Sequence, residues 1–560
     1  MVADVLSEVS AYRWRRRADA FAAGLLACVA MMGELSAAAI ANVTPRKDAI
    51  ANPWFTGPQP APAVVSIDAG RQLLVDDFVV EQTTLKRVFH QSEYHAANPV
   101  LRPDRPWEGT VAMPMSDGVW FDPKDRLFKM WYRAGTPPKQ NTCYATSRDG
   151  VHWDKSPLDV VPGTNIVLPA RRASGTAWLD LEEKDPAKRF KYFHSHSGPH
   201  PLGYEKGMWG LSLHYSADGI HWSDIVRRTG WVGDRSTVFY NPFRQAWVYS
   251  IRNPDWEGPR KRFYWESRDL EADSTWDLTR NPPLPWTGAD EQDRPYRGVT
   301  VPAELYNLDA VAYESLMVGF FTVLRGDVDN KSPVEPDRPK PNNVCLGFSR
   351  DGFHWSRPDR RAFLDYTEEK GAWNWGNVQS VGGGCLVVGD TLYFYASARA
   401  GSPEERDNGG STGLATLRRD GFASMVASGE GTLTTRPVRF SGRQLFVNLA
   451  AASGGLQVEV LDENGAAIPP FTRENSETLR GDSTLAPVTW KGGGNLSALA
   501  GKPVRFRFHL RDGSLFSFWV SADGAGASNG YVAAGGPGFT GPRDTRGAAA
   551  LEEGRQLRAR

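Results

Sequence analysis

The chain has 560 residues, with 65 basic and 65 acidic side chains, so its formal net charge is zero. This balance gives no electrostatic basis for binding nucleic acid or an anionic membrane surface. The sequence contains 20 Trp, 17 Tyr and 26 Phe together with 56 Gly and 39 Pro. Aromatic-rich strands separated by Gly and Pro turns are typical of an all-β protein.

The N-terminus resembles a targeting segment. Four arginines between Arg13 and Arg17 precede 14 mostly apolar residues at 20–33, and the sequence Ala39-Ile40-Ala41 follows. An apolar run of this length is short for a membrane span, and small residues at alternate positions are typical of a signal-peptide cleavage site. We predict a signal peptide over 1–41; the alternative is an inner-membrane anchor. Residues 42–64, rich in Pro and Ala, are predicted to form a linker.

A heptapeptide recurs along the next part of the chain. It reads SRDGVHW at 147–153, SADGIHW at 216–222 and SRDGFHW at 349–355, with weaker copies at 266–270 and 418–422. Asp-Gly between two strand-like runs is a strong hairpin signal, because the turn needs positive φ. The Ser-equivalent positions 147, 216, 267, 349 and 418 are 69, 51, 82 and 69 residues apart. Repeats of several strands at this period indicate propeller blades.

These patterns predict a five-bladed β-propeller over 65–426. Each heptapeptide would form the hairpin between the third and fourth strands of a blade, with its Trp packed between blades. The motif residues are therefore interpreted as architecture rather than chemistry. Once Cys28 leaves with the signal peptide, three cysteines remain, and this odd number argues against a disulfide framework.

The strand pattern changes after the last repeat. Alternating strands at 427–525 predict a β-sandwich accessory domain, and the Gly- and Ala-rich residues 526–560 are predicted to form a flexible tail. The predicted fold class is thus all-β, with a five-bladed β-propeller followed by a C-terminal β-sandwich.

Propellers bind ligands in the funnel on their axis, which the first strand of each blade lines. Several acids lie at or before the start of such strands. Hydrolysis of a glycosidic bond needs two carboxyl groups, one that donates a proton and one that acts as base or nucleophile. We predict Asp234 and Glu304 as the first catalytic pair and Glu108 as a third acid. Asp117 and Asp309 are predicted to contact the substrate.

Arginines and tryptophans complete the predicted binding set. Arg133 and Arg252 end the second strands of their blades, and Arg235 follows Asp234 directly. Arginine can orient carboxylates or bind an acidic sugar through two parallel hydrogen bonds. Three tryptophans are candidate platforms for sugar stacking: Trp107, Trp373 and Trp375.

Five blades, the NPVL sequence at 98–101 and the recurrent S-x-D-G-x-H-W hairpins resemble the five-bladed propeller glycoside hydrolases of families 32, 43 and 130. The added C-terminal sandwich is similar to the family 32 arrangement. The resemblance implies a glycosidase whose carboxylates lie in the funnel. Family 32 would also imply WMNDPNG, RDP and EC motifs, which this sequence lacks, so fructosidase activity is not supported. Family 43 would place an acid in each of the first three blades, and blade 2 has no clear one.

We therefore predict an exported glycoside hydrolase, secreted, periplasmic or at the cell surface, that acts on a polysaccharide or oligosaccharide. The first alternative is a non-catalytic carbohydrate-binding propeller. The second, which the sequence favours less, is a sialidase-like enzyme or a polysaccharide lyase. The predicted partner is a carbohydrate, with no nucleic acid and no membrane contact beyond the export signal. No cofactor is required; Ca²⁺ stays open, since no loop shows its ligand spacing.

Overall fold

The computed structural model describes residues 61–135, 140–170, 172, 174–197, 209–254, 258–326, 332–338, 340–401 and 409–559. The predicted signal peptide at 1–41 and all but the last four residues of the predicted linker lie outside these residues.

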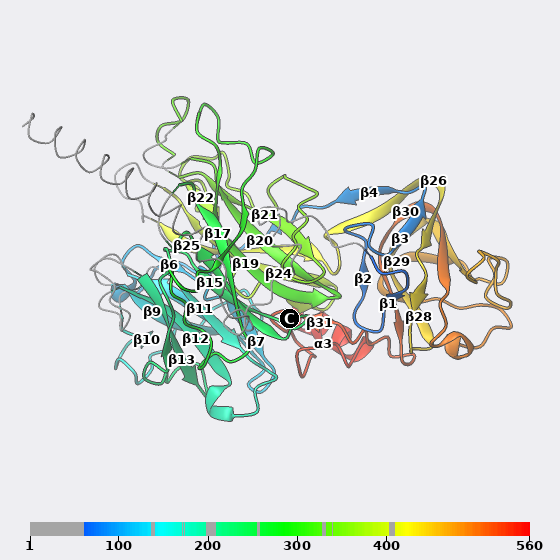
Figure 1. Ribbon diagram of the computed structural model, residues 1–560, viewed down its shortest axis with the longest axis horizontal. Helices are drawn as coiled ribbons and strands as arrows, with labels where there is room; N and C mark the ends of the chain where they lie inside the picture. The colour runs from blue at the N-terminus through cyan, green and yellow to red at the C-terminus, as the bar shows by residue number, and fades with distance from the viewer. Residues whose placement is uncertain are drawn as a thin grey trace, which may run out of the picture. The chain divides into compact units, whose positions relative to one another are not determined.

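Antiparallel sheets with the expected strand order form the first three blades (Figure 1). Aromatic and β-branched residues dominate their inner strands, which are almost entirely buried. Blade 1 contains β6 (Ala112–Met113), β7 (Val119–Asp122), β8 (Leu127–Ala134), β9 (Asn141–Ser147) and β10 (Ile166–Leu168), with the 3-10 helix η1 (Pro106–Glu108) before them; blade 2 contains β11 (Gly175–Leu179), β12 (Phe190–Ser197), β13 (Trp209–Ser216) and β14 (Arg227–Arg228), with η2 (Pro186–Lys188); blade 3 contains β15 (Thr237–Asn241), β16 (Ala246–Arg252), β17 (Lys261–Ser267) and β18 (Leu284–Gly288).

Two further sheets complete the five-bladed propeller and confirm its prediction. The strand β5, which precedes blade 1 in the sequence, forms the outer strand of blade 5 by pairing with β25. The ring of blades is therefore closed by a segment from before the first blade. Blade 4 contains β19 (Glu304–Glu314), β20 (Leu316–Leu324) and β21 (Asn342–Ser349); blade 5 contains β22 (Asn377–Gln379), β23 (Leu386–Val388), β24 (Thr391–Arg399), β25 (Gly410–Arg418) and β5 (Glu93–Tyr94).

The repeated heptapeptide folds into a turn that its own side chains stabilise. In the first copy Asp149 Oδ1 accepts hydrogen bonds from the backbone N–H groups of Val151 and His152, both at 2.8 Å. Ser147 Oγ accepts from Gly150 N–H at 2.8 Å. The copies at 216–222 and 349–355 repeat these contacts. These local bonds explain why Ser, Asp and Gly recur together, and they confirm the structural interpretation of the motif.

Each of these turns also receives a hydrogen bond from the preceding blade. Tyr395 Oη of blade 5 donates to Gly150 O of blade 1 at 2.5 Å. Trp131 Nε1 of blade 1 donates to Gly219 O of blade 2 at 2.7 Å. Trp286 Nε1 of blade 3 donates to Phe353 O of blade 4 at 2.8 Å. The hairpins therefore connect neighbouring blades through aromatic donors and buried carbonyl groups.

The motif tryptophans pack across blade boundaries in the same direction. Trp153 lies edge-on to Tyr395, with ring centroids 5.6 Å apart, and Trp222 lies edge-on to Trp131 at 6.4 Å. Trp355 contacts Trp286 of the preceding blade at 6.4 Å. The prediction that these rings pack between blades is confirmed.

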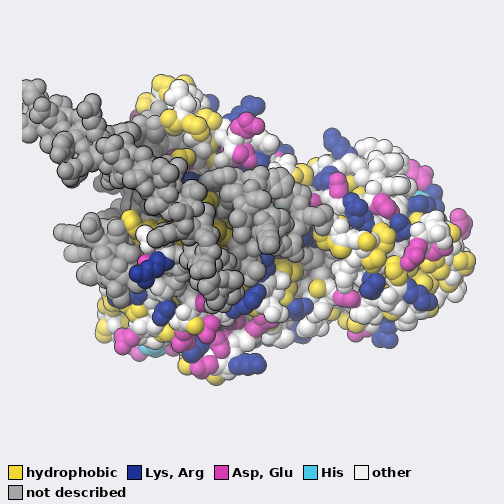
Figure 2. Space-filling view, in the orientation of Figure 1, with side chains coloured by type: hydrophobic (Ala, Val, Ile, Leu, Met, Phe, Trp, Pro, Cys, Tyr) yellow, Lys and Arg dark blue, Asp and Glu magenta, His cyan; other side chains and the backbone are white. Residues whose placement is uncertain are grey.

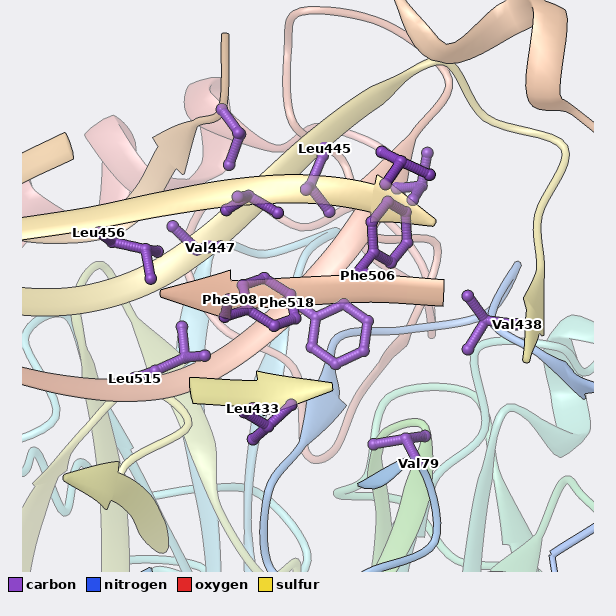
Figure 3. Close-up of a cluster of buried hydrophobic side chains, with 14 of the residues drawn as sticks. Val79, Leu433, Val438, Leu445, Val447, Leu456, Phe506, Phe508, Leu515 and Phe518 are labelled. Carbon is purple, nitrogen blue, oxygen red and sulfur yellow. The ribbon is translucent and has the colours of Figure 1, made fainter. Parts of the chain in front are cut away.

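The C-terminal part contains a seven-stranded antiparallel sheet and a separate parallel pair of two strands, β1 and β27. Its longest strands bend at irregularities in register, and the sheet encloses a core of aliphatic residues and phenylalanines (Figure 3). The strands β1 to β4 belong here rather than to the propeller, so the predicted boundary at residue 65 is wrong. The elements of this part are β1 (Val65–Ser66), β2 (Gln72–Leu73), β3 (Val80–Thr83), β4 (Lys86–Phe89), β26 (Ala423–Thr435), β27 (Val438–Arg439), β28 (Gln444–Leu461), β29 (Leu479–Pro487), η3 (Leu496–Leu499) and β30 (Arg505–Ser521).

The prediction of a flexible tail at 526–560 is wrong. Residues 531–532 form β31 (Tyr531–Val532), which pairs with the end of β19, and residues 548–558 form the helix α3 (Ala548–Arg558). The tail is ordered because Val532, Phe539 and Leu551 bury their side chains. No described helix is long and apolar enough to span a membrane.

A buried ionic network joins the propeller to both ends of the described chain. Arg71 Nη1 lies 3.0 Å from Asp420 Oδ2, and its Nε lies 3.4 Å from Glu314 Oε1 at the end of β19. Arg419 Nη2 contacts Glu314 at 3.3 Å and Asp544 at 3.0 Å. All five side chains are fully buried. Because an unpaired buried charge is costly, the loss of one side chain from this network should destabilise the protein through the charges that it leaves unpaired.

Among the described residues the cysteines are Cys143, Cys345 and Cys385, and all three are buried and carry no disulfide. Burial raises the pKa of the Cys143 thiol to about 12, which keeps it protonated and unreactive near neutral pH.

We predict that Gly219→Ala lowers stability more than Gly163→Ala. Both glycines have a positive φ, +83° and +81°, which costs a side-chain-bearing residue about 1–2 kcal/mol. A Cβ at Gly219 would also lie 2.5 Å from the Trp131 ring, whereas nothing lies within 4 Å of one at Gly163. Thermal unfolding measures both variants, and equal losses would contradict a role for the contact between blades.

We predict that Arg71→Met destabilises the protein by about 3–5 kcal/mol, because two buried carboxylates lose their partner. Arg505→Met is the control: it breaks a partly exposed pair with Glu81, 2.7 Å apart, and should cost less than about 1 kcal/mol. Denaturant unfolding gives both values. Similar losses in the two variants would show that the buried network is not a special contributor.

Candidate functional site

In each blade, the start of the first strand and the end of the second strand lie on the same face of the propeller. Antiparallel pairing places Met113 opposite Arg133, Glu304 opposite Leu324 and Asn377 opposite Arg399. Arg133 and Arg399, at the ends of their second strands, therefore lie beside the starts of the first strands of their blades.

Two of the predicted acids meet at this mouth through a shared arginine. Asp234 lies in the segment before β15, and Glu304 is the first residue of β19. Arg260 Nη1 lies 3.5 Å from Asp234 Oδ1, and Arg260 Nε lies 3.6 Å from Glu304 Oε2. The acid side chains are 26% and 29% exposed, so a ligand can reach both.

Asp234 stays ionised in this environment. Burial alone would raise the pKa of its carboxyl group, but the positive charges of Arg260 and Arg252 outweigh burial and lower the pKa below its ordinary value. Arg252 Nη1 approaches Asp234 Oδ1 at 3.0 Å. A carboxylate held ionised is suited to act as a base, as a nucleophile or as a partner for a developing positive charge.

A tyrosine that the sequence analysis did not select lies at the centre of the cationic side chains. Tyr306 is 3% exposed. Its Oη atom lies 3.3 Å from both Arg235 Nε and Lys340 Nζ, and the Arg260 guanidinium lies 5.0 Å from the ring centroid. Burial raises the pKa of Tyr306, but Lys340, Arg235 and Arg260 together lower it to about 6, against the opposing charge of Asp234. The phenol is therefore largely ionised at neutral pH.

Arg262 holds the backbone beneath this cluster. Its Nη1 donates to Arg235 O at 2.8 Å, and its Nη2 donates to Tyr306 O. Burial, with the nearby Arg252, lowers the pKa of Arg262 to about 9. Arg235 has a φ of 60°, a conformation that non-glycine residues rarely adopt, so surrounding contacts hold it in place.

A pocket of about 670 Å³ is lined by Glu304 and by Arg260, the arginine that also contacts Asp234. Arg260, Lys261, Glu304 and Asp290 contribute its charged lining, and Val301 is among its apolar residues. This volume lies within the range of small-molecule binding sites. The cluster defined by Asp234, Arg235, Arg252, Arg260, Arg262, Glu304, Tyr306 and Lys340 is called the mouth cluster below.

Asp117 and Asp309 do not belong to the mouth cluster. Arg172 holds both oxygens of Asp117, each at 2.5 Å, and Tyr192 donates to Oδ1 at 3.0 Å. Asp309 Oδ2 accepts from Asn307 Nδ2 and from Val381 N–H, both at 2.9 Å. Burial raises the pKa of both carboxyl groups. These buried contacts give the two acids a role in joining blades rather than in touching substrate.

Glu108 also has a structural place, so its prediction as a third catalytic acid is not supported. It is fully buried at the end of η1. Its oxygens accept from Asp104 N–H at 2.7 Å, Arg105 N–H at 2.9 Å and Tyr132 Oη at 2.6 Å, and Lys155 Nζ lies 2.8 Å away. These partners saturate the carboxylate and leave no position for a sugar oxygen.

The three candidate stacking tryptophans are engaged within the protein. Trp375 is 1% exposed and lies under the Arg338 guanidinium at 4.9 Å, so a sugar cannot stack on it. Trp373 packs edge-on against Tyr94 at 5.3 Å. Trp107 donates through Nε1 to Asn165 Oδ1 at 2.8 Å and is half-buried. Trp375 is therefore a core residue, and Trp107 and Trp373 pack against other parts of the protein.

Tyr306, Arg260 and Lys340 were not selected from the sequence, because their sequence context gives little indication of a position at the mouth. Tyr306 is the extra residue at a register shift of β19 between Leu305 and Asn307, so strand alternation counted from Glu304 does not predict its face. Arg260 and Lys340 come from segments between strands, where nothing in their sequence context points to the mouth. Among the described residues, no group of three or more His, Cys, Asp or Glu side chains lies together as a metal site would require.

Comparisons with known proteins found similar solved structures, but no protein-family model and no curated protein matched. A GH130-family glycoside hydrolase that targets β-1,2-mannosidic linkages in Candida mannan is 13% identical, with 59% of this chain and 94% of that chain covered and a TM-score of 0.38. An N-acetylgalactosamine deacetylase from F. plautii is 15% identical, with coverages of 63% and 97% and a TM-score of 0.38.

A putative glycoside hydrolase from Parabacteroides distasonis is 14% identical, with 58% of this chain and 96% of that chain covered and a TM-score of 0.37. At these TM-scores neither the fold nor the function of this protein rests on the matches; the five blades follow from its own strand pairing.

We predict that one tyrosine ionises with a midpoint near pH 6, whereas ordinary tyrosines ionise near pH 10. A pH titration of the near-ultraviolet phenolate absorbance measures this. Tyr306→Phe should abolish the low-pH step, and Lys340→Gln should move it to higher pH because one stabilising charge is lost. A step unchanged in Tyr306→Phe would assign it to another group.

Proposed function

We propose that this protein is an exported glycoside hydrolase that acts on a polysaccharide or oligosaccharide at the propeller mouth. The observation that carries the proposal is the convergence of Asp234 and Glu304 on Arg260 beside a pocket of about 670 Å³. Glycosidic hydrolysis requires two carboxyl groups; Glu304 lines this pocket, and the partly exposed Asp234 contacts Arg260 of the same lining. Export rests on the N-terminal sequence pattern, and no cofactor is needed for this chemistry.

The surroundings of the two acids favour a different catalytic role for each of them. Asp234, held ionised by Arg252 and Arg260, serves as the base that activates water or as the nucleophile. Glu304 pairs only at the longer distance of 3.6 Å and serves as the proton donor to the leaving oxygen. Arg260 orients both side chains, since it contacts each of them.

A second function, β-elimination by a polysaccharide lyase, is favoured by the position of Tyr306, whose Oη lies 3.3 Å from both Arg235 Nε and Lys340 Nζ, cations that lower its pKa to about 6. A phenolate can remove the proton next to the carboxylate of a uronate sugar. The electrons of that C–H bond form a C=C bond, the C–O bond to the leaving sugar breaks, and the departing oxygen takes a proton. Neighbouring cations would stabilise the developing negative charge.

We predict that Asp234→Asn and Glu304→Gln each reduce release of reducing sugar by about 10²- to 10⁴-fold, because acid–base catalysis contributes on that order. A panel of neutral, acidic and sulfated polysaccharides supplies the substrates. Asp290→Asn is the control, since Asp290 lines the same pocket but pairs with Arg360 at 2.8 Å and should retain near-full activity.

The products separate the rival functions. Hydrolysis yields reducing ends without new ultraviolet absorbance, whereas a lyase yields an unsaturated product that absorbs. Activity that persists in both acid variants contradicts the hydrolase assignment. Retention of a glycan with no product from the unmodified protein would instead identify a carbohydrate-binding propeller.

A further inference from the structure

Positive charge exceeds negative charge in the mouth cluster. Among the described residues it contains five cationic side chains, Arg235, Arg252, Arg260, Arg262 and Lys340, and two carboxylates, Asp234 and Glu304. Even with Tyr306 ionised, the cations remain in excess. The excess is not a property of the whole chain, whose formal net charge is zero. On the described part of the face in Figure 2, basic and acidic side chains intermingle.

Placing several cations close together and away from water raises the free energy of the mouth cluster. Burial, reinforced by the charge of Arg260, lowers the pKa of Lys340 below its ordinary value. Desolvation penalises each charge and like charges repel, so an added anion would relieve both effects. An excess of this kind is the electrostatic signature of a site that is completed by an anionic ligand.

The excess charge is accessible from the pocket. Arg260 lines the pocket of about 670 Å³, and its side chain is 17% exposed. Lys340 is partly exposed and lies 4.5 Å from the centroid of the Tyr306 ring. A ligand group entering from the pocket therefore meets Arg260 first, with Lys340 and Arg235 converging on the same phenol behind it.

We propose that Arg260, Lys340 and Arg235 form a subsite for the anionic group, a carboxylate or a sulfate, of an acidic glycan. This inference rests on the proposed function, because it assumes that the mouth takes a sugar. Guanidinium groups bind such anions through paired hydrogen bonds, and the ammonium group adds a point charge. The substrate class is thereby narrowed from any glycan to one that carries negative charge.

Tyr306 acts as a built-in counter-ion that the ligand displaces. In the empty site the phenolate balances part of the charge of Lys340 and Arg235, with Arg260, Arg262 and Asp234 also nearby. A bound carboxylate or sulfate takes over these cations and adds a negative charge next to the phenolate. The pKa of Tyr306 then rises, and the phenol takes up a proton on binding. Binding of an acidic sugar should therefore weaken as pH rises above 6.

Calorimetric titration of the full mature protein with three probes tests the subsite. The probes are an α-1,4-linked trigalacturonic acid, the matched neutral galactotriose, and a sulfated galactotriose. We expect at least about tenfold tighter binding of an acidic probe than of the neutral one, because a charge-assisted hydrogen bond contributes on that order. Comparison of the uronate and the sulfate shows which anion the subsite prefers.

Lys340→Gln and Lys261→Gln form a matched pair of variants. Both remove one lysine charge: Lys261 lines the pocket, whereas Lys340 contacts Tyr306 in the mouth cluster. Lys340→Gln should weaken acidic binding at least about tenfold and leave neutral binding unchanged, whereas Lys261→Gln should have a much smaller effect. Near-ultraviolet absorbance at pH 7 should show loss of phenolate when an acidic probe saturates the unmodified protein.

The inference is overturned if the neutral probe binds as tightly as the acidic ones, if no acidic probe binds, or if the two lysine variants behave alike. Thermal unfolding confirms that both variants fold. Failure of the proposed function gives a different result: acidic probes bind, but no polysaccharide in the panel releases product. The converse, hydrolysis of neutral glycans with no effect of Lys340→Gln, rejects the subsite and keeps the hydrolase.

Discussion

The hydrogen bond between each motif hairpin and an aromatic side chain of the preceding blade is the contact on which the rest of the propeller depends. It requires a backbone carbonyl at a glycine turn and an indole or phenol that reaches it across the blade boundary. A buried carbonyl without a donor would be costly, so each bond fixes the rotation of one blade against the next. That rotation determines where every first strand begins, and therefore where Asp234 and Glu304 meet.

At the mouth, the fold brings together charges that would repel one another or pair differently in an unfolded chain. Arg235 precedes β15, Arg260 precedes β17, Tyr306 lies on β19 and Lys340 precedes β21, so blades 3 and 4 must be correctly docked before the phenol meets its cations. The chemistry of the site then follows from electrostatics. The cations Lys340, Arg235 and Arg260 lower the pKa of Asp234 and also the pKa of Tyr306.

The repeated turns made the propeller predictable, because Ser, Asp and Gly act on their own backbone and leave a local pattern. The meeting of Asp234 and Glu304 at one mouth could be predicted for a similar reason, since their position relative to strand starts is local information; their catalytic roles stay a prediction. Glu108 and Trp375 were misjudged because burial by distant partners, Lys155 and Arg338, leaves no trace in the neighbouring sequence. Tyr306 was missed because its ionisation depends on cations that come from separate segments. The ordered tail depended on pairing across more than 200 residues, between β31 and β19.

The strand pairing has a consequence for biosynthesis. Every strand from β1 to β5 pairs with a strand that begins after residue 409: β1 with β27, β2 with β30, β3 and β4 with β26, and β5 with β25. Because the ribosome makes the chain from its N-terminus, these first strands have no partner strands until residues beyond 409 have been synthesised. Such distant closure is slow and exposes strand edges in the meantime. The nascent chain is therefore a natural client for chaperones that shield unpaired strands.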